Sequence, residues 1–261
     1  MRSTADPAVN LAAASELIRE AAAGGAQFIA TPEMTGLLQR KPKLFWELVK
    51  TEKDEPQIDA FGALANELGI TLLIGSLAIK TGEGRAANRS YLFGPDGDLL
   101  ATYDKMHMFD VTVSRKETWR ESAIYDAGKL PAPVDSPAGK IGLSICYDVR
   151  FAELYRFYAR QTVQIITVPA AFTVPTGQAH WHVLLRARAI ETGAFIIAPA
   201  QGGAHEDGRT TFGHSLIINP WGEIVAELGH DKPGVLIADI DLSEVAVARA
   251  KIPAWSQVPN V

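Results

Sequence analysis

The chain has 261 residues, of which 47% are hydrophobic and 21% are charged, and its formal net charge is −5 at pH 7. This balance is typical of a globular enzyme and lacks the basic excess that binds nucleic acid or an anionic membrane, so we expect a small-molecule partner. A chain of this length can hold a sizeable core by itself, and we expect one domain spanning residues 1–261.

From the N-terminus, segments of helical and strand periodicity alternate. Apolar residues recur at helical spacing over residues 8–23, a Gly-Gly pair follows, and residues 26–33 predict a short buried strand. The same order recurs with helices at 58–69, 152–161 and 179–191, followed by strands at 70–79, 163–170 and 194–200. Repeated units of this kind indicate sheets covered by helices.

Two further segments predict antiparallel hairpins. Residues 89–105 contain Pro-Asp-Gly and residues 214–228 contain Asn-Pro-Trp-Gly, both turn signals between alternating runs. Residues 233–249 predict a last strand and a helix, whereas residues 38–55 are more charged and show no clear periodicity. We therefore expect antiparallel pairs to mix with the helix–strand units.

The sequence predicts a cytoplasmic protein without a membrane span. Its single cysteine cannot form an internal disulfide, and "MRSTADPAVN" lacks the apolar segment of a signal peptide. The longest apolar stretches contain proline and are shorter than the roughly 20 residues that cross a bilayer.

That cysteine, Cys146, lies between the predicted strand "KIGLSIC" and the helical segment "AELYRFYAR". A strand-to-helix turn suits a nucleophile, because unpaired N–H groups at a helix start lower a thiol pKa and can hold an oxyanion. Glu33 and Lys105 also follow predicted strands and could lie at the same rim. Taken one at a time, a core-filling thiol and two solvated rim charges are the favoured explanations.

The histidines do not point to a base or to a metal site. No neighbouring pattern marks any of them as a general base, and two that lie two positions apart on a predicted helix face different sides. No Cys or carboxylate lies beside these two at metal-ligand spacing, so we expect no metal. The six are His107, His180, His182, His205, His214 and His230.

Taken together, the segments resemble the nitrilase, or carbon-nitrogen hydrolase, superfamily. "TPEM" is similar to its glutamate motif, "YDKMHMFD" with "RESAIYDAG" to its lysine motif and the glutamate that follows, and "GLSICYDVRFAELYR" to its cysteine motif. The likeness continues through "VPAAFTVPTGQAHWHVLLRARAIET", "AQGGAHEDGRTTFGHS" and "NPWGEIVAE", and so covers nearly the whole chain. It implies that Glu33, Lys105 and Cys146 are catalytic, with Glu121 near the site.

The resemblance also implies an architecture. Members have a four-layer αββα sandwich, in which two mixed β-sheets face each other and helices cover both outer sides. Relatives pair through helices, so the resemblance implies a homodimer or larger homo-oligomer. The chemistry needs no metal and no organic cofactor.

Residues after the cysteine indicate a branch. Cys146-Tyr147-Asp148 followed by Arg150 is similar to the amidase form, and "AAFTVPTGQAHW" with "RARAIET" most resembles the deaminated glutathione amidase group, neighbours of the omega-amidases. The implied substrate is a short acid that carries a 2-oxo group and an amide. A nitrilase that converts nitriles to acids, and a catalytically inactive binding module, remain as alternatives.

The implied mechanism assigns one task to each group. Cys146 attacks the amide carbonyl, Glu33 accepts and later returns the proton, and Lys105 with the N–H group after Cys146 stabilises the oxyanion. We expect like-charge repulsion from the nascent thiolate to raise the pKa of Glu33, offset by the charge of Lys105. Tyr147, Phe172 and Thr173 are implied to line the oxyanion and substrate site. Asp148 and Arg150 are interpreted as an ion pair or hydrogen-bond network that fixes the turn.

The chain departs from the family pattern at three places. The family opens with a strand of the type "VALVQM" before the segment similar to "STADPAVN", so one strand is expected to be missing here. "AWSQVPNV" replaces the usual "HRRP" run, and His182 occupies the position of a glutamate. All the implied catalytic residues are present.

Overall fold

The helices of the protein begin where the sequence supplies start signals. The structure is a computed structural model that describes residues 1–114 and 117–257. Asp6 caps the first helix by accepting the N–H groups of Ala8 and Val9, and Gly69, at φ 61°, ends the third. The helices are α1 (Pro7–Ala23), α2 (Pro42–Leu48), α3 (Pro56–Leu68), α4 (Ala152–Arg160), α5 (Val174–Thr192) and α6 (Ser243–Lys251), with 3₁₀ turns η1 (Glu52–Asp54), η2 (Glu121–Ala123), η3 (Cys146–Arg150) and η4 (Pro253–Ser256).

Two mixed sheets form the centre. The first has the order β1-β3-β4-β5, with β2 also paired to β3, and the second has the order β15-β14-β11-β10-β9-β8. Two small hairpins, β6–β7 and β12–β13, lie outside them. The strands are β1 (Phe28–Ala30), β2 (Lys50–Thr51), β3 (Thr71–Gly82), β4 (Arg85–Phe93), β5 (Leu99–Asp104), β6 (Asp110–Ser114), β7 (Glu117–Arg120), β8 (Val134–Ser136), β9 (Gly139–Leu143), β10 (Ile165–Thr167), β11 (Phe195–Ala198), β12 (Gly202–Ala204), β13 (Thr210–Phe212), β14 (Leu216–Ile218) and β15 (Ile224–Glu227).

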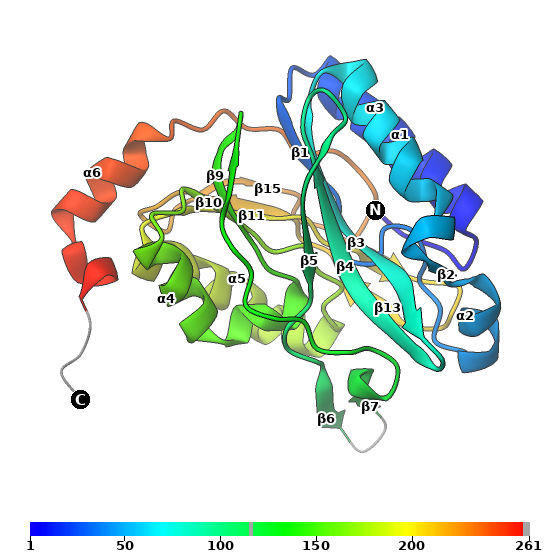
Figure 1. Cartoon of the computed structure of the whole chain (residues 1–261). Helices are drawn as coiled ribbons and strands as arrows, with labels where there is room; N and C mark the ends of the chain where they lie inside the picture. The colour runs from blue at the N-terminus through cyan, green and yellow to red at the C-terminus, as the bar shows by residue number, and fades with distance from the viewer. Residues whose placement is uncertain (115–116, 258–261) are drawn as a thin grey trace.

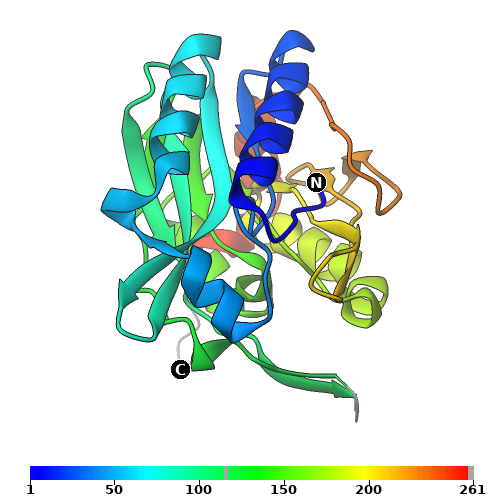
Figure 2. The same ribbon diagram turned by 90° about the vertical axis from the view of Figure 1, so that its right-hand side faces the viewer.

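The sheets and helices form the expected four layers. In Figure 1, α1 and α3 cover the outer side of the first sheet, and α4 with α5 cover the outer side of the second; Figure 2 shows the same arrangement from the side. One core cluster joins the sheets: it contains Leu73 and Leu92 from the first and Ile141 and Ile165 from the second. The αββα sandwich expected from the sequence is confirmed.

Most of the predicted elements are present among the described residues, and one is not. Residues 233–241 were expected to include a strand, but the structure describes none there, and only the helix that follows, α6, forms. Val235 packs beside the core cluster of α1 and β1 without joining a ladder. A strand needs a hydrogen-bonding partner, and no described strand offers one to this segment. No helix among the described residues is long and apolar enough to cross a membrane.

Candidate active site

The three residues singled out by the sequence meet at one place. Glu33 follows β1, Lys105 follows β5, and Cys146 is the first residue of η3, just after β9. Two of these strands belong to one sheet and the third to the other, so the site lies where the two sheets meet. The exposed fractions are 4% for Glu33, 2% for Lys105 and 7% for Cys146. All three are therefore largely shielded from bulk water.

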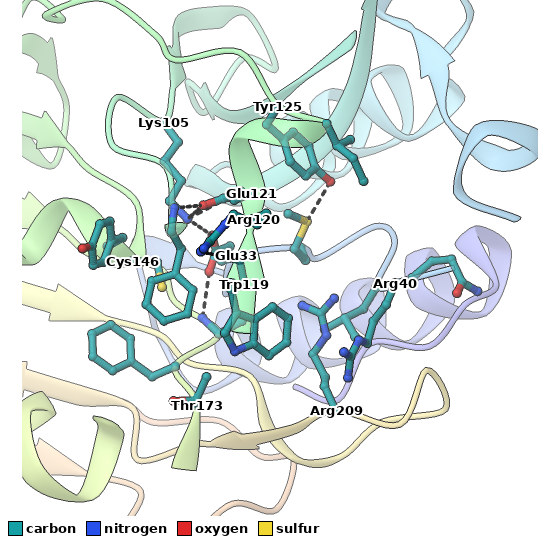
Figure 3. Close-up of a pocket in the computed structure, with 18 of the residues that line it drawn as sticks. Glu33, Arg40, Lys105, Trp119, Arg120, Glu121, Tyr125, Cys146, Thr173 and Arg209 are labelled. Carbon is teal, nitrogen blue, oxygen red and sulfur yellow. Dashed lines mark hydrogen bonds and ion pairs between the residues drawn. The ribbon is translucent and has the colours of Figure 1, made fainter. Parts of the chain in front are cut away.

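Lys105 lies between two carboxylates. Its Nζ donates to Glu33 Oε1 at 2.9 Å and to both carboxylate oxygens of Glu121 at 2.9 Å (Figure 3). The Asn88 amide donates to the same two acids, at 2.9 Å to Glu33 and 3.3 Å to Glu121. The backbone N–H of Phe109 fixes Glu121 at 2.6 Å. This network holds a buried ammonium between one buried and one partly buried carboxylate in a single orientation.

The second oxygen of Glu33 faces the side of the cysteine. Glu33 Oε2 accepts the N–H of Ala171 at 2.9 Å, and the Glu33 carboxylate lies close enough to the Cys146 thiol for each group to shift the pKa of the other. Glu33 therefore lies beside both the ammonium and the sulfur. This geometry places one carboxylate within reach of a thiol proton, as a general base requires.

Cys146 has a left-handed backbone conformation with φ of 49°. Such a conformation is uncommon for a residue with a side chain and marks a constrained turn. The amide of Cys146 donates to Pro169 O at 2.8 Å and that of Asp148 to Ile145 O at 3.0 Å. Among the hydrogen bonds of the described residues, the Tyr147 N–H between them has no acceptor, which suits an oxyanion donor.

The charges of these residues depend on each other. Burial raises the pKa of Glu33, but the charge of Lys105 and hydrogen bonds from Lys105, Cys146 and Asn88 outweigh it, so the pKa is lowered. Burial and the negative charge of Glu33 raise the pKa of the Cys146 thiol well above its usual value. Burial lowers the pKa of Lys105, yet the charges of Glu121 and Glu33 reverse this and raise it well above its usual value.

The expectation of a raised pKa for Glu33 was therefore wrong. The thiol is neutral at rest, so it does not repel the Glu33 carboxylate. The negative charge of Glu33 instead disfavours a thiolate and so raises the pKa of the thiol. The resting site contains a thiol, a carboxylate and an ammonium, with Glu33 poised to accept a proton.

Asp148 fixes the turn that carries the cysteine, as interpreted from the sequence, although its partner is not Arg150. The fully buried carboxylate accepts the Tyr103 hydroxyl at 2.6 Å, the Ile145 N–H at 2.8 Å and the His107 N–H at 3.1 Å, with His107 Nδ1 at 2.7 Å. Tyr103 and His107 flank Lys105, so this network ties the lysine strand to the cysteine turn.

Arg150 lies on the other side of the turn. Its guanidinium is 3.2 Å from His180 Nδ1 and lies over the rings of Tyr147 and Phe172, at 5.8 and 5.5 Å from their centroids. Of the two expected arrangements, an ion pair or a hydrogen-bond network, the turn therefore has the network, which Asp148 provides.

A pocket of about 260 Å³ opens above the cysteine. Its lining includes the predicted Tyr147, Phe172 and Thr173 beside Glu33, Lys105, Glu121 and Cys146. None of the described residues that line it is a histidine. A carboxylate is accordingly the base that this pocket offers to the thiol.

The outer part of the pocket was not predicted from the sequence. Arg40 and Arg209 lie on the Trp119 ring, at 5.0 and 5.3 Å from its centroid, and Figure 3 shows the three together at the end away from Cys146. Asp207 pairs with Arg209 at 2.9 Å. Only the fold brings these residues together. Asn88 was also missed, because it lies one position before the predicted hairpin at residues 89–105 and belongs to no motif.

Comparisons with known proteins show the family of the chain. A family model described as carbon-nitrogen hydrolase matches residues 1–250. The chain is 42% identical over 250 residues to a deaminated glutathione amidase of Synechocystis sp. (strain PCC 6803 / GT-S), covering 94% of this chain and 90% of the relative. It is 36% identical over 248 residues to the human omega-amidase NIT2, covering 95% and 88%.

The structure is also similar to solved ones. The crystal structure of the C. elegans NitFhit protein superposes with a TM-score of 0.89 and 35% sequence identity. The match covers 99% of this chain and 63% of the longer C. elegans chain.

Proposed function

The chain is an amide-hydrolysing enzyme of the carbon-nitrogen hydrolase family, and from that premise we propose that it cleaves the linear amide bond of a small 2-oxo acid, such as deaminated glutathione, through a Cys146 thioester. One observation carries the mechanism: in a buried pocket, Glu33 pairs with the Lys105 ammonium at 2.9 Å and lies close enough to the Cys146 thiol for the two groups to shift each other's pKa. An acid, an ammonium and a thiol in contact supply the three groups that amide cleavage needs.

The first half-reaction forms the thioester. Glu33 takes the thiol proton while the sulfur bonds to the amide carbonyl carbon. The oxygen becomes an oxyanion that Lys105 Nζ and the Tyr147 N–H stabilise. Glu33 then gives its proton to the leaving nitrogen, the C–N bond breaks, and ammonia or an amine departs.

The second half-reaction releases the acid. Glu33 takes a proton from water, the resulting hydroxide bonds to the thioester carbon, and the C–S bond breaks with return of the proton to sulfur. Glu121 holds Lys105 in place throughout, because it accepts from Nζ with both oxygens. Phe172 and Thr173 line the pocket beside the reacting carbon.

The substrate carries a carboxylate at the end remote from its amide. Arg40 and Arg209 present two guanidinium groups on the Trp119 face, at the end of the pocket away from Cys146. Guanidinium groups match carboxylates in charge and geometry. A short acid can therefore place its amide at the sulfur while its carboxylate meets the arginines.

The test is an ammonia-release screen over 2-oxo acid amides, neutral aliphatic amides, carbamoyl compounds and nitriles. We expect 2-oxo acid amides to be cleaved fastest and the Cys146→Ala variant to be inactive. Arg40→Gln should raise KM for the acid amides by roughly tenfold, the effect of losing a charged hydrogen bond, and leave neutral amides unchanged. Nitriles as the best substrates, or a folded wild-type protein that cleaves none of these compounds, would contradict the proposal.

We also propose a homodimer in a reducing, cytoplasmic environment. Val183 and Ile190 lie seven positions apart on α5 and are 67% and 53% exposed, so one face of this helix presents apolar side chains to a second copy. The buried free thiol of Cys146 must stay reduced to react. Light scattering should give twice the chain mass, and Val183→Glu should halve it. A monomeric wild type would contradict the dimer.

A further inference from the structure

Three side chains far apart in the sequence meet outside the active-site pocket. His182 lies on α5, His214 just before β14, and Glu227 ends β15. His182 Nε2 lies 2.9 Å and His214 Nδ1 3.1 Å from the same oxygen, Glu227 Oε1. These three atoms all lie within 4.8 Å of one another. We call them the His–His–Glu cluster.

The separations fit the first coordination sphere of a transition metal ion. Zinc binds imidazole nitrogen and carboxylate oxygen at about 2.0–2.2 Å in a tetrahedral arrangement, which places its ligand atoms about 3.3 Å apart. Two of the three separations in the cluster are close to that value already. Small side-chain rotations would bring the third atom pair into range and leave one position for water.

The two imidazoles are held in place by their surroundings. The Phe212 ring stacks on His214, with centroids 4.2 Å apart and planes at 18°, and meets His182 edge-on at 6.2 Å. The Trp181 indole donates to the His214 carbonyl at 2.8 Å. Metal sites gain affinity when neighbouring groups fix the orientation of their ligands in this way.

The backbone of His214 supports the same conclusion. Its φ is 58°, a left-handed conformation that costs free energy for a residue with a Cβ atom. That conformation aims Nδ1 at Glu227, and the His214 N–H is bound to His230 O at 3.1 Å. Strain of this kind persists where surrounding contacts impose it, often at ligand sites.

The cluster is also accessible. The side chains of His182, His214 and Glu227 are 32%, 24% and 28% exposed, so an ion can enter from solvent. A carboxylate with two imidazoles is a ligand set suited to zinc.

We propose that the His–His–Glu cluster binds one divalent transition metal ion, with Zn²⁺ as the expected occupant. The ion would join α5 to the β14–β15 hairpin. β13, whose Phe212 packs on His214, also hydrogen-bonds to the pocket segment through Phe212 N–H to Phe172 O at 2.9 Å. The ion therefore stabilises the wall behind the substrate pocket and takes no part in the amide chemistry.

The test is a Zn²⁺ titration against a chromophoric chelator, with the melting temperature as a second measurement. The wild type should bind one Zn²⁺ per chain with Kd on the order of micromolar or tighter, and Zn²⁺ should raise its melting temperature. Cys146→Ala should bind equally well, because the only thiol is not a ligand of the cluster.

Three variants separate the proposal from a metal-free hydrogen-bonded trio. His182→Gln and Glu227→Gln should weaken binding by at least roughly tenfold. His214→Asn, chosen because asparagine tolerates a left-handed backbone, should do the same with an unchanged circular dichroism spectrum. His180→Gln, on the same helix but outside the cluster, should bind like the wild type.

Two results would overturn the inference. A wild type that fails to compete with a chelator of micromolar affinity would show that the three residues form a hydrogen-bonded cluster only. Binding that survives His182→Gln and disappears in Cys146→Ala would place the ion at the active-site thiol. Neither result depends on amidase activity, so a failure here leaves the proposed function untouched.

Discussion

Single side chains determine the resting charge of the active site. The pKa of Glu33 is lowered, while those of Cys146 and Lys105 are raised. At neutral pH the pocket therefore holds a neutral thiol beside an ionised carboxylate. In the proposed mechanism, the nucleophile therefore forms during attack, when the proton moves to Glu33, and is not a resident thiolate.

This resting state predicts the pH profile. Because Glu33 must be ionised, kcat/KM should stay flat from mild acid through neutral pH and fall only below the ordinary pKa of a glutamate. Glu33→Gln should lower kcat by about 10²–10⁴ and abolish the acid limb. The measurement is initial-rate ammonia release across pH. A wild-type rate that rises through the ordinary thiol range would instead indicate a resident thiolate.

The pH profile of kcat/KM also needs a measurement of folding at each pH. Since the folded pKa of Glu33 is lowered, its contribution to stability is complete above the unfolded value and is lost as pH falls through the folded value. Circular dichroism at each pH then separates protonation of the base from acid unfolding. The profile is informative only where the spectrum is unchanged.

The buried carboxylate of Asp148 predicts a second effect. Asp148→Asn replaces an acceptor oxygen with a donor that would face the Ile145 N–H or the His107 N–H. We expect the free energy of unfolding to fall by about 2–4 kcal/mol, as for other buried charged hydrogen bonds. Urea titration measures it, and Asp135→Asn on exposed β8 should have little effect. Equal stability of both variants would refute this role.

At the level of elements, β3 approaches the segment that carries Glu33. A Cβ atom on Gly75 would lie 2.1 Å from Thr31 O and 2.3 Å from Pro32 O, both backbone atoms. Gly75→Ala must therefore push residues 31–33 away, which costs about 1–3 kcal/mol of stability and displaces Glu33. We expect a lower melting temperature and a kcat reduced by at least roughly tenfold, since small displacements of a catalytic group are costly.

The same strand supplies the matched control. Gly82, also on β3, has nothing within 4 Å of the added Cβ position, and its φ is not in the left-handed region. Gly82→Ala should leave both melting temperature and kcat near the wild-type values. If both substitutions behave alike, the close approach at Gly75 does not position Glu33.

Sequence periodicity predicted some of the helices and strands and missed others. The helix–strand units and both hairpins were predicted, because each has apolar residues at a regular spacing and a Gly or Pro boundary. The β6–β7 and β12–β13 hairpins were missed, since their short strands lie outside the main sheets and leave no long pattern. Residues 233–241 had a strand pattern but no partner strand, and pairing is not written in local sequence.

In the candidate site, too, the sequence predicted only the residues that lie in recognisable motifs. Glu33, Lys105 and Cys146 could be predicted because each lies in a long motif and follows a strand. Arg40, Trp119 and Arg209 could not, because their proximity depends on how three separate loops fold over the pocket. The His–His–Glu cluster likewise depends on α5 packing beside β14 and β15.

At the scale of the whole molecule, the active site joins the two sheets. Glu33 and Lys105 follow strands of one sheet and Cys146 follows a strand of the other, and a single core cluster contains residues from both. The thiol and its base therefore meet only when the sheets are docked. Loss of docking should remove activity and packing in the same step.

This predicts a single cooperative unfolding transition. Urea titrations followed by tryptophan fluorescence, far-UV circular dichroism and ammonia release should share one midpoint at a fixed protein concentration, and calorimetric and van't Hoff enthalpies should agree. Trp181 is fully buried in α5, which covers the second sheet, so its fluorescence reports on that sheet. The far-UV circular dichroism signal also includes α1 and α3, which cover the first sheet. The two optical signals together therefore report on both sides of the sandwich. Two separated transitions would mean that each sheet, with its own helices, folds as an independent unit. In that case activity would have to disappear in the earlier one, because either half alone leaves the sulfur without its carboxylate.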